Sequence, residues 1–245
     1  MSSSDTAAGR LHQILLALRQ SAQNRQLRTA WGQALAISPT DQQALFVAVA
    51  NVMSLPDEAE RTIRDLPDQN HELLLRWRPA VDQAMSIAHQ FEGATANFTA
   101  HYSEAHLFSL EHGADLVARY QTTTPELVAD GAQVASAISL VHDLLETLAT
   151  SNLEPFVKET LVRHATAMAT ALQLVRVTGP QGIRAAAIDA ASALKLFTDE
   201  HPEKDTRAPI RRFLEVLSAV ANTVTIAAGG LQLAAPVAAL LLGTS

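Results

Sequence analysis

Histidines and acids are the residues in this chain whose types could do chemistry. Of the nine histidines, three lie near three acids: His101, His106 and His112 with Glu104, Glu111 and Asp115. Helical metal sites need ligands three or four residues apart on one face, and these histidines are five and six apart. The spacing favours exposed or hydrogen-bonded histidines, so we expect no metal and no cofactor. An acid sensor is an alternative, because imidazoles with a pKa near about 6.5 become charged between roughly pH 7 and 5.

Two further stretches have suitable residue types but unsuitable spacing. His142 and Asp143 place a base beside an acid, yet adjacent helix residues point in different directions. The stretch 178–182, Thr-Gly-Pro-Gln-Gly, leads into a helix start, but it has neither the P-loop pattern nor a preceding strand. The chain also lacks cysteine and a Gly-x-Ser-x-Gly elbow. We therefore predict a protein that is not an enzyme.

The charge balance restricts the classes of partner. The formal net charge is −7 at pH 7, and the isoelectric point is near 5.7. A nucleic-acid-binding protein needs a basic face that displaces counterions from phosphate, so we expect no nucleic acid as partner. The absence of cysteine is compatible with the cytoplasm. We therefore expect a cytoplasmic protein, with membrane association through its C-terminus as a further expectation.

Helical periodicity recurs along most of the chain, and no run shows the alternation of a strand. Successive segments place apolar residues at spacings of three and four, and the three stripes are Val134, Ile138, Val141, Leu145 and Leu148; Val157, Leu161, Ala165, Met168, Leu172 and Val175; and Ile183, Ala187, Ala190, Leu194 and Phe197. Prolines 39, 56, 125 and 180 lie where helices begin. The sequence predicts an all-α, multi-helix bundle of about nine to ten helices with a very apolar C-terminal helix or helical hairpin.

One shift in composition suggests a domain boundary. Residues 198–210 form a charged, proline-containing connector. It separates an amphipathic helical bundle over residues 1–197 from an apolar C-terminal segment over residues 211–245. We expect three parts in this order.

The C-terminal segment is the most unusual part of the sequence. From Val216 to Gly243, 28 consecutive residues contain no Asp, Glu, Lys or Arg. As one helix this stretch would be about 42 Å long, against the roughly 30 Å hydrocarbon core of a bilayer. Small and polar residues would then follow one stripe, here named the polar seam, and its members are Ser218, Asn222, Thr225, Gly229, Gln232, Pro236 and Gly243. A seam of this kind is a candidate contact with lipid-embedded or partner helices.

Two environments account for the apolar segment, and both stay open at this point. In a membrane, the basic residues Arg207, Arg211 and Arg212 would keep the preceding side in the cytoplasm. In a soluble protein, residues 211–245 would form the buried central helix of a bundle. A hairpin turning at Gly229 and Gly230 is a third geometry, whose arms of about thirteen residues are too short to span a bilayer.

In the order of hydropathy alone, this layout resembles that of colicin-type pore-forming domains and Bcl-2-like proteins. The stretch 30–33, Ala-Trp-Gly-Gln, departs from the Asn-Trp-Gly-Arg signature of the Bcl-2 class, so we assign no family.

We expect a non-enzymatic helical protein whose C-terminal segment anchors in a membrane or inserts conditionally, as an effector or pore-former does. The alternative is a soluble scaffold or regulatory protein–protein interaction module. The expected partners are membrane lipid or partner helices, with a homo-oligomer as a further expectation.

Overall fold

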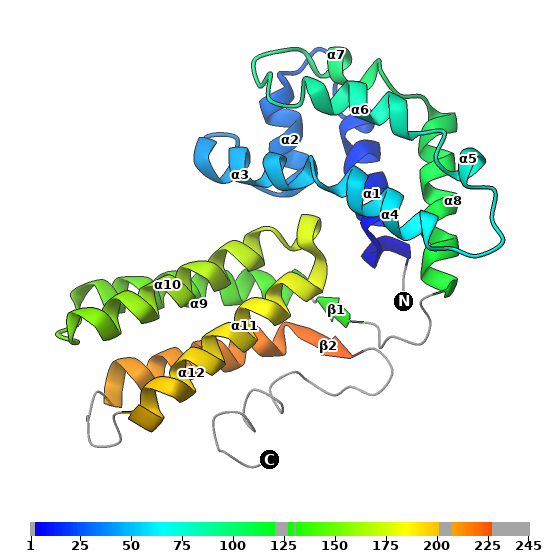
Figure 1. The fold of residues 1–245 in the computed structure, drawn as a ribbon. Coiled ribbons are helices and arrows are strands. Elements are labelled where there is room, and N and C mark those ends of the chain that lie inside the picture. Colours follow the sequence, from blue (N-terminus) through cyan, green and yellow to red (C-terminus); the bar gives the residue numbers. More distant parts are fainter. Residues whose placement is uncertain (1–2, 121–126, 130, 201–206, 227–245) are drawn as a thin grey trace. The chain divides into compact units, whose positions relative to one another are not determined.

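The computed structural model describes residues 3–120, 127–129, 131–200 and 207–226 (Figure 1). Within these residues the fold is all-helical, as the periodicity predicts. Ten α-helices have nine residues or more, and they are accompanied by two shorter helices, a 3₁₀ turn and two strands of three residues. The chain divides into two compact units, Met1–Thr124 and Pro125–Ser245.

The first unit is a helical bundle arranged around its first long helix. Its elements are η1 (Ser3–Asp5), α1 (Ala7–Gln20), α2 (Leu27–Leu35), α3 (Gln42–Val52), α4 (Leu55–Arg64), α5 (His71–Leu74), α6 (Arg78–Ser86), α7 (Thr95–Thr99) and α8 (Glu104–Tyr120). Helix α1 packs against α2, α4, α7 and α8. Leu11, Leu15 and Leu18 of α1 are completely buried. The apolar stripe of α1 thus forms the centre of this core.

Local signals set the helix starts in this unit. The Asp41 carboxylate accepts a hydrogen bond from the Ala44 N–H and caps α3. Asn70 caps α5 in the same way through the Leu73 N–H. Pro56 and Pro79 lie in the first turns of α4 and α6. Backbone N–H groups in the first turn have no partner within the helix, so proline costs no hydrogen bond there. The predicted helix starts near Pro39 and Pro56 are therefore confirmed.

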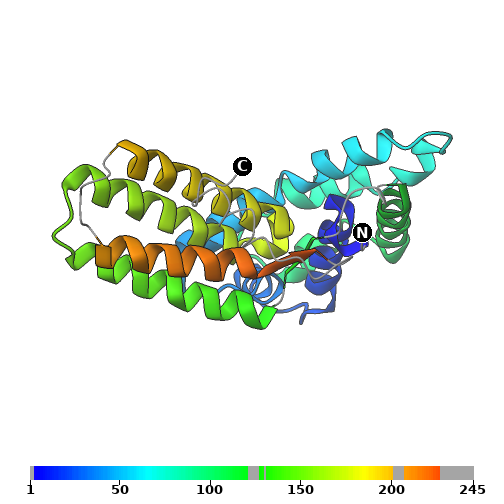
Figure 2. The same ribbon diagram turned by 90° about the horizontal axis from the view of Figure 1, so that it is seen from below.

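The second unit is a four-helix bundle with a short two-stranded ribbon (Figure 2). Its elements are β1 (Leu127–Ala129), α9 (Gly131–Thr150), α10 (Pro155–Gln173), α11 (Val175–Glu200), α12 (Arg207–Asn222) and β2 (Val224–Ile226). Helix α9 packs on α10, α10 on α11, and α11 on α12, and α12 closes the ring against α9. This arrangement gives every helix two neighbours along its apolar stripe.

The predicted apolar stripes form the core of the four-helix bundle. Helices α9, α10 and α11 bury Val141, Leu161 and Ile183 together with most of the other predicted positions. Helix α12 contributes Phe213, Val216, Leu217, Val220 and Ala221, none of which is more than 1% exposed. The charged connector therefore does not divide two domains: α11 continues to Glu200, α12 begins at Arg207, and both belong to one core.

A backbone break at Gly179 divides α11 into two segments. Gly179 has φ of 69° and ψ of −178°, a region that is open almost only to glycine. Pro180 follows at the start of the longer segment. The helix start predicted at Gly179 and Pro180 is confirmed.

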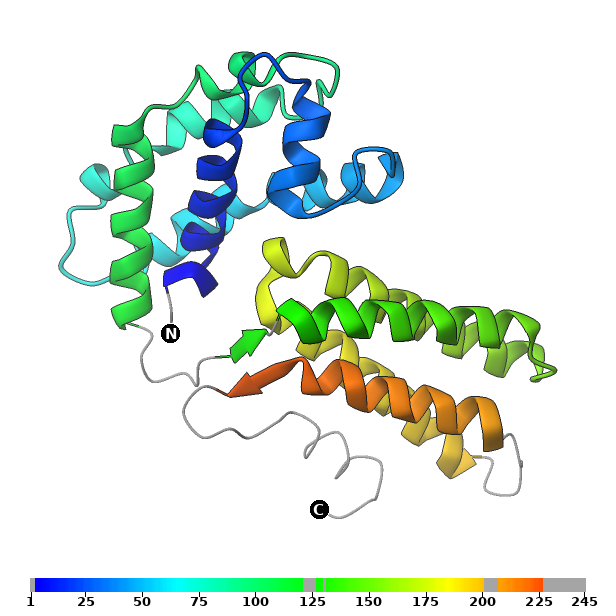
Figure 3. The same cartoon turned by 180° about the vertical axis from the view of Figure 1, so that it is seen from behind.

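The described residues do not form one continuous helix from Val216 onward, which is one of the geometries that the sequence leaves open for the C-terminal segment. Helix α12 ends at Asn222, and β2 follows as an extended strand. β2 pairs antiparallel with β1 in the register Leu127 with Ile226, Val128 with Thr225, and Ala129 with Val224 (Figure 3). The β-branched run from Thr223 to Ile226 favours extended backbone over helix, so the chain leaves the helix there. The predicted turn at Gly229 and Gly230 lies outside the described residues.

Candidate interaction surface

The structure describes three of the seven residues of the polar seam and places them in two different elements. Ser218 is exposed and Asn222 is half-buried on α12, whereas Thr225 lies in β2 opposite Val128. The remaining seam residues, Gly229, Gln232, Pro236 and Gly243, lie outside the described residues. Because α12 ends at Asn222, a helical stripe at 100° per residue does not continue to Thr225.

Two of the flanking basic residues, Arg211 and Arg212, belong to the outer surface of α12. Arg207 is its first residue. Arg211 and Arg212 pair with Glu215 at 3.8 and 3.3 Å. Such exposed pairs contribute about 0.5 kcal/mol or less. Helix α12 is amphipathic, with Arg211 and Ser218 opposite its buried stripe, and it is one of four bundle helices rather than a central one.

The histidines of the first unit take part in local contacts. His106 Nδ1 accepts a hydrogen bond from the Ser103 N–H at 3.1 Å, and His112 stacks on Phe108. His12 of α1 lies in the field of Glu111 and Asp115 of α8, but burial lowers its pKa. No three His, Asp or Glu side chains are placed to hold a metal ion anywhere in the described part of the chain.

Helix α3 presents a surface that the sequence interpretation did not identify. Residues 42–56 contain no charged side chain. Leu45, Ala48, Val49 and Val52 are buried on the inner side of α3. Its outer side is also apolar, and we name that side the α3 face: Phe46, Val47, Ala50 and Met53, all exposed, with Phe46 60% exposed. Apart from Gln42 and Gln43 in its first turn and Asn51, α3 is apolar on its inner and outer sides, and such a helix is expected to be covered on both sides.

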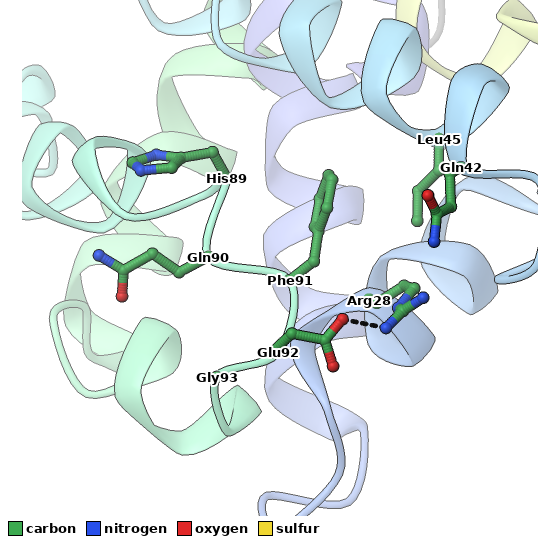
Figure 4. Close-up of a pocket in the computed structure, with 8 residues that line it drawn as sticks. All are labelled: Arg28, Gln42, Leu45, His89, Gln90, Phe91, Glu92 and Gly93. Atoms are coloured by element: carbon green, nitrogen blue, oxygen red, sulfur yellow. Dashed lines mark hydrogen bonds and ion pairs between the residues drawn. The ribbon is translucent and has the colours of Figure 1, made fainter.

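A pocket of about 410 Å³ flanks the α3 face (Figure 4). Leu45 and Gln42 of α3 line one wall, and residues 89–93 line the other. The Phe91 ring lies between Leu45 and Gln42 on one side and His89 and Gln90 on the other, so His89 and Gln90 are on the side away from α3. The ring of Phe46 meets the Phe91 ring edge to face, with centroids 6.4 Å apart. The pocket and the exposed ring of Phe46 therefore lie side by side.

Hydrogen bonds hold the 89–93 loop in place. The Leu27 N–H donates to Gly93 O at 2.8 Å, and the Arg28 N–H donates to Phe91 O at 2.9 Å. The indole N–H of Trp31 donates to Ala88 O at 3.2 Å. These bonds use the first N–H groups of α2, so that helix start has no free N–H pair to offer an anion. The pocket wall is therefore preformed by these hydrogen bonds.

The charged groups at the rim neutralise one another. The Arg28 guanidinium pairs with the Glu92 carboxylate, and the Gln26 amide donates to Glu92 at 3.1 Å. The pocket wall and the α3 face together present an apolar, net-neutral surface. Such surfaces are typical of contacts with other apolar surfaces rather than with charged substrates.

No protein-family model, curated protein or solved structure matches the chain.

The α3 face carried a sequence signal of its own. Residues 42–56 are fifteen uncharged residues in a row and place apolar side chains on both sides of a helix. This pattern is typical of a helix that is covered by protein on two sides. The longer uncharged run at the C-terminus is more conspicuous, and the eleven residues of α3 are too few to suggest a membrane span. No helix among the described residues is both long enough and apolar enough to cross a bilayer.

Proposed function

We propose that this chain is a non-enzymatic, all-helical protein–protein interaction module that binds an apolar surface of a partner protein through the α3 face. One observation carries the proposal: α3 is uncharged and apolar on both its inner and outer sides, yet Phe46 is 60% exposed. Covering one large apolar side chain stabilises a complex by about 1.5 to 3 kcal/mol. Exposure of such a helix in isolation is therefore costly.

The chemistry beside the α3 face supports binding rather than catalysis. Arg28 is paired with Glu92, and the other polar residues at the pocket are Gln42, His89 and Gln90. Neither a nucleophile beside a base nor a carboxylate pair is among the residues that line it. The half-buried Phe91 ring supplies an apolar wall for an anchor side chain of a partner.

Site-specific photo-crosslinking tests this proposal. A benzophenone-bearing phenylalanine analogue replaces Phe46 in the full chain, which is then irradiated in its native cells. The matched control carries the same analogue in place of Phe156, which is 69% exposed on α10. We expect a protein adduct from position 46 and not from position 156. Absence of any protein adduct at position 46, or an adduct to lipid alone, would contradict the proposal.

Membrane engagement by the C-terminal segment is a second candidate function. It is supported by the sequence of residues 227–245, which has no charged residue and follows β2 directly. The test is flotation of the full chain and of a chain that ends at Ile226 with phosphatidylcholine vesicles. The shorter chain keeps α12 and β2 and hence the whole described core. We expect only the full chain to float, and equal behaviour of the two chains would contradict membrane engagement.

A further inference from the structure

We infer that the occupant of the α3 face is a second copy of this chain, in a two-fold symmetric dimer. This inference rests on the proposed function, because it names the partner for the same surface.

The shape of the surface is self-complementary. Phe46 projects from α3 and is 60% exposed, and the pocket lined by Leu45 and Phe91 lies directly beside it. When a surface carries a projection beside a hollow, two copies can pack about a two-fold axis. Each projection then enters the hollow of the other copy. The pocket volume of about 410 Å³ is in the range of sites that hold a bulky apolar group.

The charge of the surface favours the same occupant. Residues 42–56 bring no charge into the contact, and the Arg28–Glu92 pair at the rim carries one charge of each sign. Two copies therefore meet without burying an unpaired charge, which would cost several kcal/mol. A partner with a strongly charged surface would find no complementary group on the α3 face.

The extent of the surface sets the expected strength. The α3 face consists of four exposed apolar residues on a helix about 16 Å long, whereas a standard-size interface has about 20 to 30 residues on each side. We expect a reversible dimer that dissociates on dilution, with Phe46 as its main anchor.

Sedimentation velocity of the purified full chain over a range of concentrations tests the inference. We expect the sedimentation coefficient of the native chain to rise with concentration, Phe46→Glu to weaken dimerisation at least about tenfold, and the control Phe156→Glu to behave as the native chain. Circular dichroism and thermal melting check that Phe46→Glu folds, and Val47→Lys provides a second variant of the same face. A native chain that stays monomeric, or dimerisation that both variants of the α3 face leave unchanged, overturns the inference.

Disulfide trapping tests the symmetry directly, since the chain has no cysteine. Gln42 lies in the pocket wall one turn before Phe46, close to the expected two-fold axis. We expect Gln42→Cys to form a covalent dimer rapidly on mild oxidation, whereas Ser218→Cys on the exposed side of α12 does not. Equal rates for the two variants overturn the inference. A monomeric chain that still crosslinks to a different protein from position 46 overturns the dimer alone and leaves the proposed function in place.

Discussion

The rings of Phe46 and Phe91 meet edge to face, with centroids 6.4 Å apart and planes at 83°. This contact joins α3 to the loop of residues 89–93 and forms the boundary between the α3 face and its pocket. Edge-to-face pairs stabilise by about 0.5 to 1.5 kcal/mol beyond the apolar area that they bury.

The first prediction concerns the coupling of these two rings. In a double-mutant cycle on Phe46→Ala and Phe91→Ala, we expect a coupling free energy of about 0.5 to 1 kcal/mol. It is measured by chemical unfolding at protein concentrations low enough for the chain to be monomeric. Additive effects of the two substitutions would show that the rings do not support each other.

The second prediction concerns Arg78, which ties α6 to α4. Its guanidinium pairs with Asp57, with Glu60 at 3.1 Å and with Asp82 at 2.9 Å. Burial opposes the charge on Arg78, but hydrogen bonds to Asp57 and Asp82 outweigh it and raise the pKa. We expect Arg78→Met to lower the free energy of unfolding by about 1 to 3 kcal/mol. The control Arg211→Met removes one exposed pair and should change it by less than about 0.5 kcal/mol. Similar effects of the two changes would contradict a network role.

The third prediction concerns the close contact between α8 and α4. A Cβ at Gly113 would lie 2.8 Å from Cδ1 of Ile63, which is completely buried. We expect Gly113→Ala to destabilise the first unit by about 1 to 3 kcal/mol in calorimetric melting, despite the better helix propensity of alanine. Ile63→Val removes the clashing methyl group, so its own cost should be smaller in the Gly113→Ala background than in the native chain. An equal cost in both backgrounds would exclude the clash as the cause.

The fourth prediction concerns the role of α12 in the second core. Leu217 is completely buried, and its neighbour Ser218 is exposed. We expect Leu217→Ala to cost about 2 to 5 kcal/mol and Ser218→Ala to change stability by less than about 0.5 kcal/mol, measured by denaturant unfolding. A chain that ends at Asp205 lacks α12 altogether and should lose the cooperative melting of the second unit. If Leu217→Ala costs no more than Ser218→Ala, α12 is not a core helix.

The fifth prediction concerns pH. Burial lowers the pKa of His12 below its ordinary value, although Glu111 and Asp115 act in the opposite direction. The unfolded chain then binds this proton more readily than the folded one. The stability contribution is therefore complete above the unfolded pKa of about 6.5, and it is lost as pH falls through the lower folded value.

Melting temperatures at pH 7.5 and 5.5 measure this effect. Burial also lowers the pKa of His164 in the second unit, with Arg163 adding to it, so both units should lose stability on acidification. The His12→Gln variant removes this contribution from the first unit alone. Between pH 7.5 and 5.5, the melting temperature of its first unit should fall less than that of the native chain. An unchanged fall would assign the pH dependence to other groups.

The sequence determined the class of this fold through periodicity. Spacings of three and four place Val141, Leu161 and Ile183 on buried stripes of successive helices, and a capping acid at Asp41 or a proline at position 56 or 180 starts each helix locally. These signals act over one or two helical turns, so they are readable without knowledge of any distant contact.

The tertiary structure decided where the apolar residues are covered. Uncharged runs at 42–56 and at 216–243 look alike in the sequence, but Val216 to Val224 enter a four-helix core and a strand pair, whereas Phe46 faces outward beside Phe91. Hydropathy indicates how strongly a side chain favours burial, but it does not indicate which surface covers that side chain. The hydrophobic effect is non-directional, and the covering residues are distant in the chain. For this reason the all-helical bundle was predictable from its residues, whereas the outward position of Phe46 beside Phe91 was not.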